Sequence, residues 1–164
     1  MHYEMDFDGL LDLQASVARN PQVVQEELAA AVTEADLLLT REVQDAMPRA
    51  SGLLAQSVFH EEQVSESGAI GVVATPLIYA APVELGTKPH FPPIEPLIDW
   101  VKVKLGITGD KEARGVAFLI ARKISRVGTK EQRPFGLVFQ AHESQVGEIF
   151  SRAVGRIAAR MAGG

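Results

Sequence analysis

The stretch that decides the fold is Tyr79–Pro93, YAAPVELGTKPHFPP. We predict a helical turn from Tyr79 to Leu85, and Gly86 should close it in a left-handed conformation, which glycine adopts at little steric cost. The following stretch, Lys88–Pro96, holds four prolines. It should therefore be an irregular loop, because proline has no backbone N–H and breaks helices and strands.

Two further motifs flank this stretch. Upstream lies Pro48–Val58, PRASGLLAQSV. Downstream, the Gly-Thr-Lys at residues 86–88 recurs at residues 128–130, and the second copy leads into Arg133-Pro134-Phe135. None of the three motifs has the residue types of a catalytic site.

In this order the motifs resemble the tail-completion, or head–tail joining (neck), proteins of long-tailed bacteriophages, a family that includes the lambda-type minor tail protein Z. The first motif matches at Arg49, Ser51, Gly52, Leu53 and Ser57. The second matches at Tyr79, Ala80, Val83, Glu84, Gly86 and Thr87. The third matches at Pro134 and Phe135. The sequence departs from the family pattern in a longer stretch over Ile94–Arg126 and in Gly-Leu-Val-Phe after Phe135.

The resemblance implies a structural virion protein, made in the cytoplasm of a host bacterium, that joins head to tail. It implies a ring of identical subunits, a hexamer by family analogy, around the DNA channel. Neighbouring neck and tail proteins would be its other partners, and DNA would pass without sequence-specific contact. It implies neither catalysis nor a cofactor.

Size and composition fit one domain with a short helical arm over residues 1–20. The chain has 164 residues, 46% of them hydrophobic and 23% charged, which is ordinary for a globular protein. It has no cysteine, so disulfides and thiolate metal sites are excluded. We expect neither a signal peptide, since residues 1–9 are acidic and polar, nor a membrane-spanning helix.

Charge is divided unevenly along the chain. Residues 1–110 hold 17 acids and 6 bases, whereas residues 111–164 hold 4 acids and 10 bases. Such a split is typical either of surfaces of opposite charge that pair within an assembly or of two solvated faces of one domain. In a ring, the acidic helix of one subunit would face the basic segment of the next, or would line the channel and repel DNA.

Hydrophobic periodicity predicts an α+β fold, in which a small antiparallel sheet packs against a long N-terminal helix with two or three further helices. The expected helices are Asp8–Arg19, Pro21–Met47, Ile94–Leu105, Lys111–Val127 and Ser144–Met161. The expected strands are Leu53–Gln63 and Ala69–Thr75, with Phe135–Phe139 as a third. In the long helix, six acids including Asp36 are expected opposite the apolar stripe.

The sequence holds no recognisable set of catalytic or metal-binding residues. Its four histidines show no metal-ligand spacing, and His60-Glu61-Glu62 is only half of a zinc-protease motif. Glu84 would need a partner such as His90 to act as a catalytic acid. A structural role is the alternative, with its carboxylate accepting backbone N–H groups or pairing with an arginine of a neighbour.

We therefore predict no catalytic and no metal-binding residues, and a set of subunit contacts. Phe91 and Phe135 are either core residues or exposed anchors, and three arginines at helical spacing form a ridge expected on the outer face. The predicted contacts are Glu84, Thr87, Lys88, Pro89, Phe91, Arg133, Phe135, Arg152, Arg156 and Arg160. Two rival functions remain: a nucleic-acid-binding module using the arginine ridge, and a small hydrolase.

Overall fold

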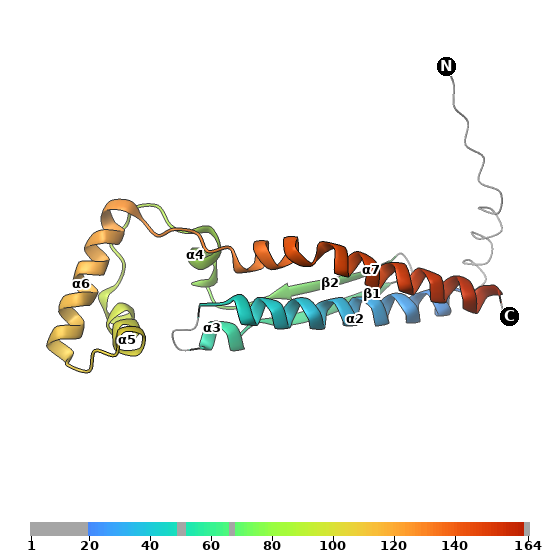
Figure 1. Cartoon of the computed structure of the whole chain (residues 1–164), viewed down its shortest axis with the longest axis horizontal. Helices are drawn as coiled ribbons and strands as arrows, with labels where there is room; N and C mark the ends of the chain where they lie inside the picture. The colour runs from blue at the N-terminus through green and yellow to red at the C-terminus, as the bar shows by residue number, and fades with distance from the viewer. Residues whose placement is uncertain (1–19, 49–51, 66–67, 163–164) are drawn as a thin grey trace, which may run out of the picture. The chain divides into compact units, whose positions relative to one another are not determined.

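The α+β fold is confirmed by a computed structural model, which describes residues 20–48, 52–65 and 68–162. A long helix comes first, a two-stranded antiparallel sheet follows, and further helices complete the chain (Figure 1). The elements are α2 (Pro21–Ala46), α3 (Leu53–Gln56), β1 (Phe59–Ser65), β2 (Gly68–Ala74), α4 (Ala80–Leu85), α5 (Ile94–Leu105), α6 (Asp110–Val127) and α7 (Pro134–Ala162). The predicted helix Asp8–Arg19 lies outside the described residues, as do Arg49 and Ser51.

The chain forms two compact units whose boundaries fall inside α2, β1, β2 and α7. The first unit comprises Met1–Leu38, His60–Val72 and His142–Gly164, and the second comprises Leu39–Phe59 and Val73–Ala141. A single domain was the expectation from length.

In the first unit, α2 packs against α7. Small side chains at the contact, Ala31 and Ala35 of α2 and Ala153 of α7, let the helices approach closely, and Ile149 fills the space between them. Leu38, Val146 and Phe150 pack around this cluster. On α7, Ile149, Ala153 and Ile157 recur at a spacing of four residues and are all buried.

The hairpin of β1 and β2 also contacts α2 within this unit. Thr33 Oγ1 donates to Glu62 Oε2 at 2.8 Å. Asp36 lies against Gly71 of β2, where a β-carbon would collide with its carboxylate. Asp36 is only 4% exposed and its Oδ2 has no hydrogen-bond partner. The expected solvent position of Asp36 is therefore wrong: the hairpin covers this side of α2.

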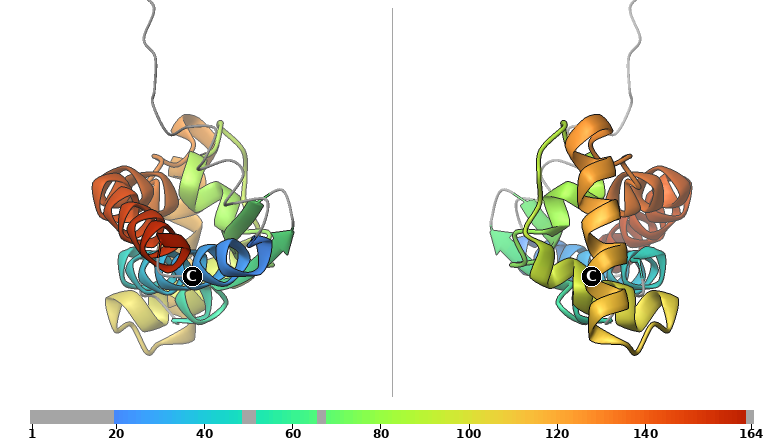
Figure 2. Two further views of the ribbon diagram at one scale, coloured as in Figure 1. Left: turned by 90° about the vertical axis from the view of Figure 1, so that its right-hand side faces the viewer. Right: turned by 90° about the vertical axis from the view of Figure 1, so that its left-hand side faces the viewer.

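In the second unit, α5 and α6 pack as a helical pair (Figure 2). Val101 of α5 meets Ala113 and Ala117 of α6, and all three are fully buried. Lys102 Nζ donates to Asp110 Oδ1 at 2.5 Å across the connection. Trp100, Leu105 and Val127 are exposed, and the alanines of α6 form its buried face.

One expected strand, Leu53–Gln63, is wrong in part, and another, Phe135–Phe139, is wrong altogether. Leu53–Gln56 is a helix, because Gln56 and Ser57 close i→i−4 hydrogen bonds to Gly52 and Leu53, and the strand begins only at Phe59. Phe135–Phe139 is the first part of α7 rather than a third strand. Proline suits the first position of a helix, where a missing N–H has no cost, so Pro134 starts the helix it was expected to precede.

Asp36 gives a prediction about pH. Burial raises the pKa of its carboxyl above the ordinary 3.8, with His60 opposing and Glu62 adding to the shift. The charged form is thus disfavoured in the fold, so this group's contribution to stability is full below pH 3.8 and is lost as pH rises through the folded-state pKa.

We expect Asp36→Asn, which cannot ionise, to gain stability relative to the wild type as pH rises through that window, measured by urea unfolding. Glu61→Gln, on the exposed strand β1, is the matched control. Parallel stability curves for Asp36→Asn and the wild type would contradict the assignment.

Candidate functional site

The two Gly-Thr-Lys copies, which are 42 residues apart, pair with each other in the second unit. Thr87 N donates to Thr129 O at 3.0 Å, and Thr129 N donates to Thr87 O at 3.2 Å, which makes an isolated antiparallel bridge. The two hydroxyl groups are also hydrogen-bonded, with 3.0 Å between their oxygens. We call this pairing and the residues that flank it the Gly-Thr-Lys junction.

Glycine is required on both sides of the junction. Gly86 and Gly128 have φ angles of 69° and 72°. A β-carbon on Gly86 would lie 2.5 Å from Thr129 O, and one on Gly128 would collide with Thr87 O. Gly86 has the predicted positive φ but an extended ψ of −175°, a conformation that is almost exclusive to glycine. The repeat is therefore a backbone pairing device.

Glu84 caps the first turn of α7. Its Oε2 accepts from Phe135 N and its Oε1 accepts from Gly136 N, both at 2.9 Å. These N–H groups have no partner within the helix, and a carboxylate there also interacts favourably with the helix dipole. Val83 O accepts from Gln132 N at 2.9 Å beside this cap. The expectation that Glu84 accepts backbone N–H groups is confirmed.

The first motif is also a local structural device. Gly52 has a φ of 78° at the start of α3. Ser57 Oγ lies 2.7 Å from Leu54 O and 2.7 Å from Thr75 Oγ1, so it joins the end of α3 to the residue after β2. Ser57 therefore ties two segments of the second unit together.

Other predicted contact residues of the second unit are accessible. Lys88, Pro89 and Arg133 are exposed, and Arg133 has a φ of 53°, unusual for a side-chain-bearing residue. Phe91 is 53% exposed, with its ring tilted against that of Phe118 at 6.1 Å between centroids. Phe135 is half-buried. Their role as subunit contacts stays a prediction.

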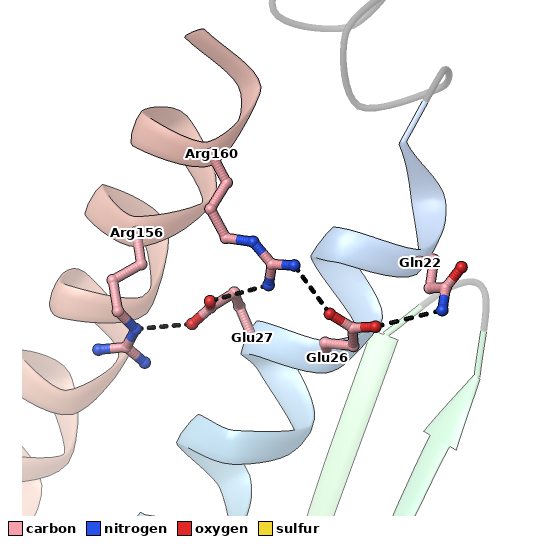
Figure 3. Close-up of polar contacts among 5 residues, drawn as sticks. All are labelled: Gln22, Glu26, Glu27, Arg156 and Arg160. Carbon is pink, nitrogen blue, oxygen red and sulfur yellow. Dashed lines mark hydrogen bonds and ion pairs between the residues drawn. The ribbon is translucent and has the colours of Figure 1, made fainter. Parts of the chain in front are cut away.

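The arginine ridge does not point away from the chain. Arg152 pairs with Glu34 at 2.7 Å, and Arg156 pairs with Glu27 at 2.6 Å. Arg160 reaches both Glu26 and Glu27 of α2, at 3.0 and 3.1 Å (Figure 3). Each arginine precedes an inner-face residue by one position, about 100° around the helix, so it flanks the α2–α7 contact.

The expected pairing of acids with bases thus occurs inside one chain. Side-chain exposure of the paired residues, 14% for Glu27 and 43% for Arg156, places these ion pairs at the rim of the α2–α7 contact. Replacing all three arginines by glutamate would break these intrachain ion pairs. An effect of that change on assembly would therefore not show that the arginines contact another subunit.

No metal site is formed by the part of the chain that the structure describes: no three of its His, Cys, Asp and Glu side chains are placed to hold an ion. None of the described helices is both long and apolar enough to cross a membrane. His90 Nδ1 lies 2.9 Å from Lys88 O in its own loop, whereas Glu84 is bound to the start of α7.

The structure thus brings Glu84, Thr87 and Phe135 together in the junction and leaves the arginine ridge in the other unit. Sequence reasoning missed the pairing of the two repeats and the role of Gly136, whose position leaves room for the Glu84 carboxylate. The repetition of Gly-Thr-Lys was the available signal. Comparison with protein-family models, with curated proteins and with solved structures found no match for this chain.

The junction predicts unequal costs for equal glycine substitutions. Gly106 has nearly the same φ as Gly128, 68° against 72°, but no atom lies within 4 Å of the position that a β-carbon on Gly106 would take. Gly106→Ala should therefore lower the free energy of unfolding by only about 1–2 kcal/mol of backbone strain. Gly128→Ala should cost about 3 kcal/mol or more, because it adds a collision with Thr87 and because the ψ of Gly128 is −160°, against 20° at Gly106, in a region that is almost exclusive to glycine. Equal losses in urea unfolding would argue against the junction.

The cap predicts a graded response at Glu84. Glu84→Ala leaves two N–H groups of α7 without their acceptor and should lower the free energy of unfolding by about 1–2 kcal/mol. Glu84→Gln keeps one acceptor oxygen and should cost less. Glu148→Ala, at an exposed position of α7, is the control and should change stability by less than about 0.5 kcal/mol. A loss at Glu84 no greater than at Glu148 would refute the cap.

The α2–α7 ion pairs predict a shifted titration. The hydrogen bond from Arg156 is the main cause that lowers the pKa of Glu27 below its ordinary 4.5, burial opposes the shift, and Arg160 adds to it. This stabilisation is complete above pH 4.5 and is lost as pH falls through the lower, folded-state pKa.

In an NMR titration, Arg156→Gln should raise the pKa of Glu27 toward 4.5. Arg114→Gln, an exposed arginine of α6, should leave it unchanged. If the pKa of Glu27 is the same in wild type and Arg156→Gln, the ion pair does not form in solution.

Proposed function

We propose that this chain is a structural component of the neck or tail of a long-tailed bacteriophage, which joins head to tail as a ring of identical copies around the DNA channel. The observation that carries the proposal is the Gly-Thr-Lys junction. The residues behind the resemblance, among them Glu84, Thr87 and Phe135, are used there for backbone pairing and helix capping. This structural use of the motif residues fits the structural virion proteins that the sequence resembles.

Exposed apolar side chains of the second unit support association with other subunits. Ile78, which precedes the short helix α4, and Leu85, the last residue of α4 and the neighbour of Gly86, are 91% and 73% exposed. Single exposed hydrophobic residues are common, but a group of them around a built structural feature is typical of a surface that a partner covers. Identical copies that bind through two different surfaces form a closed ring when the rotation between them closes.

The intrachain ion pairs count against the rival nucleic-acid function through the arginine ridge. Arg152, Arg156 and Arg160 are already paired with carboxylates of α2. Phosphate binding would have to replace these contacts. The net charge of −5 further disfavours approach to DNA at long range.

The proposal is tested by mass in solution. We expect the wild type to form an oligomer whose mass is a multiple of 17.7 kDa, and Ile78→Asp with Leu85→Asp to leave a folded monomer, because a buried charge without a partner disrupts a subunit contact. Val154→Asp, at an exposed apolar position of α7, is the control. Circular dichroism checks folding. A monomeric wild type at high concentration, or an unchanged oligomer in the double variant, would contradict the proposal.

A further inference from the structure

The outward side of α6 carries two adjoining depressions, of about 340 and 610 Å³, that share Lys123 and Val127. Both lie within the second unit, along the end of α6 and the start of the next loop. Their lining includes Leu119, Arg122, Lys123, Arg126, Val127 and Lys130. We call this surface the α6 groove; α6 is the yellow-to-orange helix in Figure 2.

The α6 groove is strongly basic. Residues 119–130 hold four bases and no acid. All four bases are exposed, and none forms an ion pair with any residue for which the structure gives a position. Glu131 is the one acid on the lining. The bases of the α6 groove thus differ from the three arginines of the ridge, each of which pairs with a carboxylate.

The same groove exposes large apolar side chains. Leu119 is 62% exposed and Val127 is 66% exposed, on the same helix as three of the four bases. A surface of this kind suits a ligand that is both acidic and apolar, because burial of the apolar groups supplies affinity and the charges fix its position. A bare phosphate chain would leave the two apolar side chains uncovered.

The chain itself contains a segment with the complementary properties. Residues 1–19 hold four acids and one base, together with Phe7, Leu10, Leu11 and Leu13. The sequence predicts a helix over Asp8–Arg19. The negative charge and the apolar content of this segment therefore match the α6 groove.

We propose that the α6 groove binds residues 1–19 of a second copy of this chain. Each copy then presents one segment and one groove, so the contact is head-to-tail and can repeat around a ring. The match of segment and groove stands on its own, and only the choice of a second copy as donor rests on the proposed function. Counterions screen such a contact, so it weakens as salt rises.

Site-directed cross-linking tests the contact directly, because the chain has no cysteine of its own. Two full-length single-cysteine variants of different tag size, Leu11→Cys and Leu119→Cys, are mixed under mild oxidation. We expect a disulfide-linked pair that contains one of each. Val154→Cys, of similar exposure on α7, replaces Leu119→Cys as the control and should give little mixed product.

Charge reversal tests whether the α6 groove is responsible. Arg122→Glu with Arg126→Glu, added to the Leu119→Cys copy, should lower the mixed cross-link about tenfold or more, since two attractions become repulsions. Lys104→Glu with Arg114→Glu makes the same charge change at exposed positions outside the groove and should leave the yield nearly unchanged. Equal losses in both pairs would overturn the proposal.

Two further outcomes would also overturn it. In one outcome, Leu11→Cys and Leu119→Cys in one chain form only an internal disulfide, and the mixed variants form none. The donor is then not a second copy, but this result does not contradict the ring of the proposed function. If a short DNA duplex binds the full chain more tightly than a fluorescent peptide of residues 1–19, and the groove charge reversal abolishes that binding, the groove is a nucleic-acid site.

Discussion

The second unit depends on the pairing of Thr87 with Thr129. Two backbone hydrogen bonds and a contact between hydroxyl groups join segments 42 residues apart, and the α5–α6 pair lies in the chain between them. The close approach requires glycine at 86 and 128, and it sets Glu84 where its carboxylate can cap α7. The close approach of these two backbone segments therefore accounts for both glycines, both threonines and Glu84.

Charge has two different uses along this chain. In the first unit, glutamates of α2 and arginines of α7 form ion pairs at the rim of an alanine-rich helix contact. In the second unit, the bases of α6 form no ion pair with any described residue, and exposed apolar side chains lie on the same helix. Surface ion pairs contribute little stability each. The first set is already paired within its own chain, and in the proposal above the second set binds another copy.

Sequence reasoning recovered the elements whose signal is local. Pro21 and the apolar stripe located α2, and α5 was predicted with its observed bounds, Ile94–Leu105. It failed where a distant contact decides: α7 begins at Pro134 because Glu84, far away in sequence, supplies the cap. The position of Asp36 was predicted wrongly, because hydrophobic periodicity identifies only one apolar stripe. It cannot show that β2, with Gly71, covers another side of α2. The repeat was visible, but its pairing was not.

Under the proposed function, this chain joins heads to tails as a structural part of the particle. The most direct measurement is electron microscopy of a phage in which the gene for this chain is disrupted. The account predicts filled heads and complete tails that accumulate separately, and their joining when purified wild-type chain is added to the extract. Joined, infectious particles that form at the normal yield without this chain would contradict it.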